Sequence, residues 1–154
     1  MKPNTQLEII IEPYDQNIQK LALKLRAFII NLVPEANELI WDNYNAVALA
    51  YSKSKKLKDA FCHIALYAEY VNFGFNRGSE LTKSSVVLHG KGKLIRHIKV
   101  KDFDDFPQKE IKKMIWEAVV NSERLNPKLL EINDDPQSIV MSISEKKIRP
   151  NIQD

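Results

Sequence analysis

The stretch AFCHIALYAEYVNFGFN, residues 60–76, decides the fold class, because it contains two short segments in which apolar side chains recur at every second position. A period of two is typical of β-strands that bury one face. A short polar gap around Glu69 separates the segments, and this spacing predicts an antiparallel hairpin. The residues expected on its buried face are Cys62, Ile64, Leu66, Val71, Phe73 and Phe75.

Similar patterns lie on both sides of the hairpin. Three further segments alternate like strands, and two longer ones carry apolar residues at helical spacing. Pro34 suits the first turn of a helix, so PEANELIW, residues 34–41, is predicted to be a short helix. The further strands are expected at residues 45–51, 94–101 and 138–144, and the long helices at 14–33 and 106–121.

This order of elements predicts an α+β fold. It consists of an antiparallel sheet of about five strands with two long helices packed on one face, a two-layer sandwich. Residues 1–145 are expected to form a single domain, followed by a basic C-terminal tail at 146–154. SKSKKLKD, residues 52–59, is interpreted as a polar, lysine-rich connection between strands.

Composition excludes several classes of protein. The chain has 154 residues, a net charge of +3 and one cysteine, so it has no internal disulfide framework and fits a reducing cytoplasm. It lacks a run of eighteen apolar residues, so no membrane span is expected. Helix-turn-helix, zinc-finger and RNP motifs are missing, so sequence-specific nucleic-acid recognition is not expected.

The most distinctive polar stretch is GKGKLIRHIKVK, residues 90–101, which holds five Lys or Arg residues and no acid. A nucleotide P-loop is excluded, because that motif needs G-x-x-x-x-G-K-[ST] opening into a helix. One interpretation is structural: a glycine turn leads into a strand whose wet face is basic. The other is a site for a small anionic ligand or for phosphate groups. Its candidate residues are Lys91, Lys93, Arg96, His97 and Lys99.

A second candidate site is a pocket on the polar face of the sheet. His63 and Tyr67 share a face of one predicted strand, and Trp41 and His97 could join them there. A face with His and Tyr more often belongs to a packed sheet than to an active site. No catalytic residue is assigned, since the chain has neither a G-x-S-x-G turn nor a paired-carboxylate signature, and Cys62 alternates onto the apolar face. No metal ligand or cofactor is assigned either, because cysteine and histidine do not occur at ligand spacing.

The central motifs resemble the YdhG-like family, domain of unknown function 1801. YVNFGFNRGSEL at 70–81 and LHGKGKLIRHIKV at 88–100 are similar to its central signature. The chain departs from the family at Thr82–Lys83, where members often carry Asp-Pro, and at Lys91, often Thr. The resemblance implies a compact α/β sandwich without an established catalytic site. It also implies one alternative, because a related member is described as a frataxin-like iron chaperone.

The sequence therefore supports a small cytoplasmic protein with a basic surface. We expect a non-catalytic binding module for small anions or phosphate groups, whose physiological partner the sequence does not identify. The alternatives left open are a frataxin-like iron-binding protein, by family analogy, and an enzyme of unknown reaction.

Overall fold

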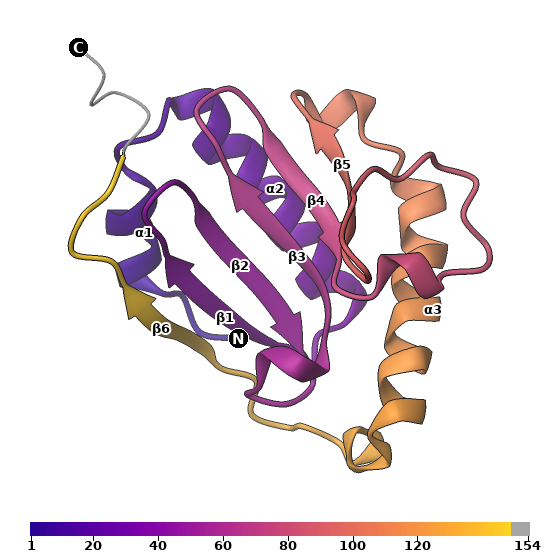
Figure 1. Ribbon diagram of the computed structural model, residues 1–154. Coiled ribbons are helices and arrows are strands. Elements are labelled where there is room, and N and C mark those ends of the chain that lie inside the picture. The colour runs from indigo at the N-terminus through magenta and orange to yellow at the C-terminus, as the bar shows by residue number, and fades with distance from the viewer. Residues whose placement is uncertain (149–154) are drawn as a thin grey trace.

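A computed structural model describes residues 1–148 and has an α+β fold built on a mixed sheet of six strands (Figure 1). The strands follow one another across the sheet in the order β5-β4-β3-β2-β1-β6. All neighbours are antiparallel except β1 and β6, which are parallel. The strands are β1 (Asn37–Asp42), β2 (Val47–Ser52), β3 (Ala60–Leu66), β4 (Val71–Phe75), β5 (Arg96–Val100) and β6 (Ser138–Ile143).

The hairpin predicted from residues 60–76 forms as β3 and β4. Ile64 is paired with Phe73 across the two strands, and Phe73 and Phe75 are fully buried. Their alternation with polar residues places the two rings on the face that packs against the helices. The six residues expected on the buried face all belong to one hydrophobic core.

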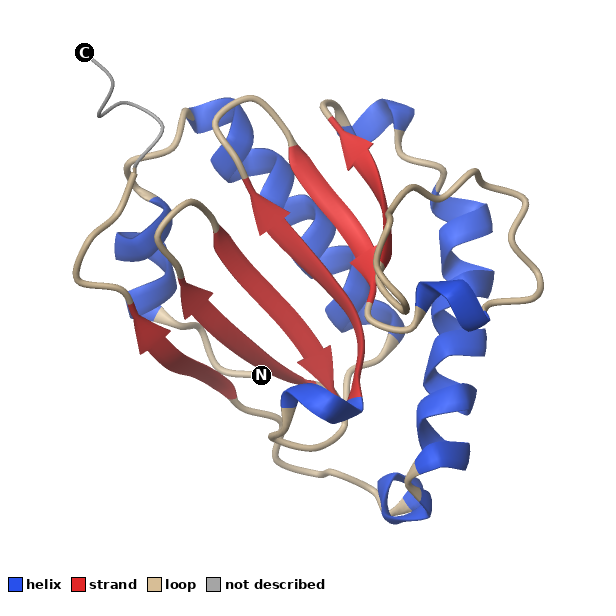
Figure 2. Cartoon of the chain, in the orientation of Figure 1, coloured by secondary structure: helices blue, strands red, loops and turns tan. Residues whose placement is uncertain are grey.

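Three α-helices accompany the sheet, and in Figure 2 the strands pass in front of the first two. They are α1 (Thr5–Ile11), α2 (Gln16–Leu32) and α3 (Gln108–Leu125). Phe106, just before α3, packs its ring 5.3 Å from Phe28 of α2 and 5.2 Å from Phe73 of the sheet, so one cluster of rings joins both long helices to β4. Within residues 1–148 no helix combines the length and the apolar character needed to cross a membrane.

The predicted short helix at residues 34–41 was wrong, because this segment forms β1. The apolar alternation was hidden by two acidic residues, Glu38 and Asp42, whose side chains are buried on the core face. A buried carboxylate at a core position makes a strand look irregular to a pattern search. Helix α1 was not predicted either, because its seven residues are too few to show a clear helical period. The side chain of Asn4 caps its first turn.

The sheet has one strand more than expected and is mixed instead of antiparallel. After α3, a short 3₁₀ helix at Pro127–Leu130 leads the chain to the far edge of the sheet, where β6 lies parallel to β1. The parallel direction follows from this long crossover, since a hairpin can only produce antiparallel neighbours. A side-chain pattern alone does not report strand direction.

Part of the expected C-terminal tail is attached to the domain. The Lys147 ammonium lies 2.5 Å from the buried carboxylate of Asp42, and the Ile148 amide donates to the carbonyl of Tyr44. The rest of the predicted tail, residues 149–154, lies outside the described residues.

Candidate functional site

The face of the sheet turned away from the hydrophobic core, which we call the outer face, carries all four residues of the predicted pocket. Trp41 lies in register with Ala48, and Ala48 with Ala65. His63 and His97 both lie opposite Gly74 of β4, and Tyr67 directly follows β3. The structure therefore places the four on one face but spreads them over several strands.

All three histidines of the chain lie in one row of this face. A Cβ added at Gly74 would be 2.4 Å from Nε2 of His63, so the imidazole of His63 lies across this glycine. His97 lies on the other side of Gly74, and an isolated bridge pairs His89 with His97. The missing side chain at Gly74 is what allows His63 and His97 to approach.

Burial favours the neutral form of two of these imidazoles, those of His63 and His97. Burial lowers the pKa of His63; a hydrogen bond with Asn76, 2.9 Å between His63 Nδ1 and Asn76 Oδ1, opposes the shift, and nearby His97 adds to it. Burial also lowers the pKa of His97, and the charges of His89 and Lys99 lower it further. At neutral pH these rings can donate and accept hydrogen bonds but add little positive charge.

Three side chains stack on one another beside the row of histidines, at the turn between β3 and β4. The rings of Tyr67 and Tyr70 stack with centroids 5.0 Å apart. The Lys99 ammonium lies 4.2 Å from the centroid of Tyr70. Next to Lys99 in the register is Asn72, whose amide oxygen is buried and has no hydrogen-bond partner among residues 1–148. Because this oxygen is buried, the face presents the exposed ammonium of Lys99 but not the acceptor.

The glycine turn before β5 has the predicted structural role. Gly90 adopts a positive φ of 146°, and a Cβ there would lie 2.7 Å from the carbonyl oxygen of Ile95. The Arg96 guanidinium donates to the carbonyls of Gly92 and Ile95, both at 2.7 Å. It therefore holds the turn together, while Lys91 in the same turn is exposed to solvent.

Neither a nucleophile nor a metal centre emerges from the described residues. Cys62 is fully buried, and burial raises the pKa of its thiol well above the usual value, which disfavours the reactive thiolate. Across residues 1–148, no three His, Cys, Asp or Glu side chains gather closely enough to hold a metal ion.

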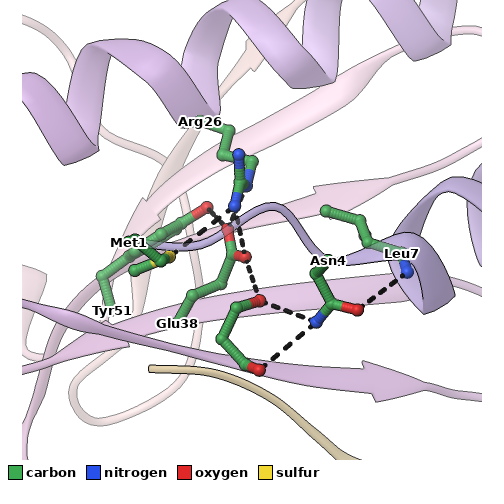
Figure 3. A network of polar contacts seen from close by, with 7 residues as sticks. Met1, Asn4, Leu7, Arg26, Glu38 and Tyr51 are labelled. Atoms are coloured by element: carbon green, nitrogen blue, oxygen red, sulfur yellow. Dashed lines mark hydrogen bonds and ion pairs between the residues drawn. The ribbon is translucent and has the colours of Figure 1, made fainter. Parts of the chain in front are cut away.

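The most elaborate polar cluster surrounds the buried carboxylate of Glu38 on the core face, where Figure 3 shows Arg26 reaching it from α2. Arg26 donates two hydrogen bonds to Glu38, at 2.6 and 3.0 Å. The Tyr51 hydroxyl donates at 2.7 Å and the Ser138 hydroxyl at 2.6 Å. Asn4, the cap of α1, donates to the Ser138 hydroxyl at 2.8 Å. Every oxygen of this carboxylate is satisfied from within, so the cluster ties α1, α2, β1, β2 and β6 together and offers nothing to a ligand.

A cavity of about 780 Å³, which we call the lysine cavity, lies at the end of the sheet where β2 ends and β3 begins. Three parts of the chain meet there: the connection at residues 53–59, Arg77 after β4, and the segment that follows α3. Exposed Lys55, Lys56, Lys58 and Lys128 take part in no ion pair with a described residue. The residues that line the cavity are Asn37, Lys53, Ser54, Lys55, Lys56, Lys58, Asp59, Arg77, Leu125, Asn126, Lys128, Leu129, Glu131, Ile132 and Asn133.

The floor of the lysine cavity is held by hydrogen bonds among uncharged groups and one buried acid. The carboxylate of Asp59 accepts from the Ser54 hydroxyl at 2.7 Å and from the Asn126 amide at 3.3 Å. Buried Asn37 donates to the carbonyl of Ser54 at 2.9 Å and accepts from Asn133 at 3.3 Å. These bonds join three segments that are far apart in the sequence, so the backbone that carries the lysines is fixed.

Sequence reasoning missed the lysine cavity. The lysine-rich segment at residues 52–59 was interpreted as a polar connection. Asn126 and Lys128, which complete the cavity, lie about seventy residues further along the chain. The available signal was the density of lysine in this segment, together with serine and aspartate that can form local turns.

No family model, no curated protein and no solved structure matches the chain. The resemblance to the YdhG-like family therefore stays a prediction from sequence motifs.

Proposed function

We propose that the protein is a non-catalytic binding protein that holds a small anion with phosphate groups in the lysine cavity. The observation that carries this proposal is the set of four lysines that pair with no carboxylate of residues 1–148, Lys55, Lys56, Lys58 and Lys128, at one cavity of about 780 Å³. Like charges brought together at a concave surface repel one another, and an anion relieves that repulsion.

The neighbouring groups support a multivalent anion over a neutral ligand. Lys53 is already paired with Glu123 at 2.7 Å, and Arg77 with Glu80 at 2.6 Å, so the cavity keeps these two cations neutralised. The four remaining lysines exceed the one exposed acid of the lining, Glu131. Ammonium groups bind phosphate oxygens as point charges and need no fixed fork geometry.

This proposal keeps the predicted class of ligand and moves the site. In the basic strand Arg96 closes its own turn and Lys99 packs on Tyr70, so two of the five predicted anion-binding residues already have internal partners. The resemblance to the YdhG-like family, which implies no catalytic site, supports a binding role. A cytoplasmic location belongs to the same proposal, and the single buried thiol supports it.

Calorimetric titration with pyrophosphate at low salt tests the proposal. The variant Lys55→Gln/Lys56→Gln/Lys58→Gln should weaken binding at least about tenfold, because each charge-assisted hydrogen bond contributes about 1.5–3 kcal/mol and about 1.4 kcal/mol corresponds to a factor of ten. The three side chains are exposed, so the substitution should leave folding intact.

The matched control removes the same charge from another surface. Lys109→Gln/Lys112→Gln/Lys113→Gln changes three exposed lysines of α3. We expect the control to bind pyrophosphate within about twofold of the parent, apart from long-range effects that salt screens. Equal losses in both triple variants, or no binding by the parent, would exclude the lysine cavity as the site.

A further inference from the structure

The outer face has a one-sided charge distribution. The six strands contain only two carboxylates, Glu38 and Asp42 of β1, and both are buried on the core face. The outer face therefore carries no strand carboxylate, whereas the exposed ammonium of Lys99 lies on it. A surface with cations and no anions attracts a polyanion and repels a second copy of itself.

The same face offers flat apolar groups beside small ones. Half-buried Trp41 of β1 is followed across the sheet by half-buried Ala48 and Ala65, then by Asn72 and Lys99. The two alanines leave space next to the indole ring. A planar ring placed there would contact Trp41.

We infer that the outer face binds single-stranded nucleic acid, with bases stacked on its aromatic side chains and phosphates near its lysines. Single strands present unstacked bases and a regular row of negative charges, which match the aromatic side chains and the lysines of this face. A duplex hides its bases and would use only the cations.

The dimensions of the face suit an extended strand better than a single small molecule. Trp41 and His97 lie on β1 and β5, four strand spacings apart, which is about 19 Å. The lysine cavity and three smaller cavities of the described chain lie elsewhere, and none of the four includes Trp41, His63 or His97 in its lining. Small ligands are usually enclosed by concave pockets, whereas strands of nucleic acid follow open sheet surfaces.

Lysines outside the strands extend the positive surface past β5. The turn before β5 carries exposed Lys91 and Lys93, and the bridge between His89 and His97 fixes this turn to the edge of the sheet. Lys99 stays exposed although it packs on Tyr70, so the three lysines together could neutralise about three phosphates. For single strands this number predicts a slope of about −2 for log affinity against log salt concentration.

Fluorescence anisotropy with labelled oligothymidylate and oligouridylate, at about 20 and 150 mM salt, tests this inference. Trp41→Leu should weaken binding at least about fivefold, as expected for the loss of one stacked base. The control is Trp116→Leu, which removes the other tryptophan from the exposed surface of α3 and should bind like the parent. Circular dichroism verifies that both variants are folded.

A second pair of variants separates the outer face from general charge and from the lysine cavity. Lys91→Gln/Lys93→Gln should reduce the salt slope to about −0.7, whereas Lys109→Gln/Lys113→Gln should leave it unchanged. The Lys55→Gln/Lys56→Gln/Lys58→Gln variant should retain oligonucleotide binding even where it loses pyrophosphate, so this inference and the proposed anion site can fail separately.

Three outcomes would overturn the inference. The first is no oligonucleotide binding by the parent at low salt, including the case in which size exclusion shows a dimer that covers the face. The second is equal weakening by Trp41→Leu and Trp116→Leu. The third is equal slopes for the two double-lysine variants, which would mean diffuse attraction to the whole surface.

Discussion

Replacing Glu38 with leucine tests whether the buried carboxylate stabilises the fold. The substitution removes the acceptor of the Tyr51 hydroxyl, which is fully buried, and an unsatisfied buried donor costs about 1–3 kcal/mol. Removing one partner of a buried ion pair costs about 3–5 kcal/mol. The Arg26 side chain is 20% exposed and can recover hydration, so we expect a total loss of about 3–5 kcal/mol instead of the sum of both costs.

Urea denaturation and thermal unfolding, both followed by circular dichroism, measure this loss. For a chain of about this length each kcal/mol lowers the melting temperature by about 2–4 °C, so Glu38→Leu should lower it by about 6–20 °C. The reference is Lys109→Ala on the exposed surface of α3, which should cost less than about 0.5 kcal/mol. If Glu38→Leu is no more destabilised than Lys109→Ala, the network contributes nothing to stability and this reasoning is wrong.

A triple variant distinguishes stability from structural specificity. Arg26→Met/Glu38→Leu/Tyr51→Phe removes these three polar side chains together. Of the groups that bind the Glu38 carboxylate, only the Ser138 hydroxyl then lacks its acceptor. Replacement of a whole buried ion pair by apolar side chains is often neutral or stabilising by about 1–4 kcal/mol. We therefore expect the triple variant to be markedly more stable than Glu38→Leu. If the triple variant is as unstable as Glu38→Leu, the loss of stability comes from losing the ion pair itself and not from Arg26 and Tyr51 left without their acceptor.

Three further predictions concern the core, metal binding and pH. Phe73→Ala should cost about 3–5 kcal/mol, because Phe73 is fully buried, while exposed Lys55→Ala should cost less than about 0.5 kcal/mol; equal urea midpoints would contradict the packing. Anaerobic calorimetry should show no low-micromolar binding of ferrous iron, because the Glu117 carboxylate already accepts several hydrogen bonds; a saturating isotherm lost in Glu110→Gln/Glu117→Gln would favour the iron alternative. Since the folded state lowers the pKa of His63, the unfolded chain binds more protons, and stability should fall as pH drops below about 6.5 until the lowered pKa is passed; an equally steep fall in His63→Gln would show that another group is responsible.

The elements with an uninterrupted side-chain pattern could be predicted from the sequence. The hairpin of β3 and β4 and the helices α2 and α3 keep their apolar period throughout, and they lie within a few residues of the predicted ranges. β1 failed because Glu38 and Asp42 occupy core positions. Their stabilising partners, Arg26 and Lys147, come from other parts of the chain, and no local pattern reveals a partner at that separation.

The candidate residues of the outer face were predicted better than their roles. The period of two placed His63 and His97 on one face, and the register through Gly74 brings them together. The same period could not show that Arg96 would turn back to its own carbonyls or that Lys99 would pack on Tyr70. A long side chain can reach partners that are not its neighbours in the sequence. A basic residue type alone therefore does not predict a charge that is available to a ligand.

The two lysine-rich segments illustrate this point with opposite outcomes. The segment at 90–101 looked like an anion site, yet its arginine and one of its lysines are used internally. The segment at 52–59 looked like a solvated connection, yet the hydrogen bonds of Asp59 with Ser54 and Asn126 fix it against the chain after α3 and leave three of its lysines at a cavity. What makes a cluster of cations available to a ligand is the presence of other groups that fix the backbone without neutralising the charge. Serine and asparagine do this in the lysine cavity through their hydrogen bonds to Asp59, and a Ser54→Ala/Asn126→Ala variant should therefore weaken pyrophosphate binding although it removes no lysine and changes no charge. If binding is unchanged while the fold is retained, the lysines act through their charge alone and the frame is dispensable.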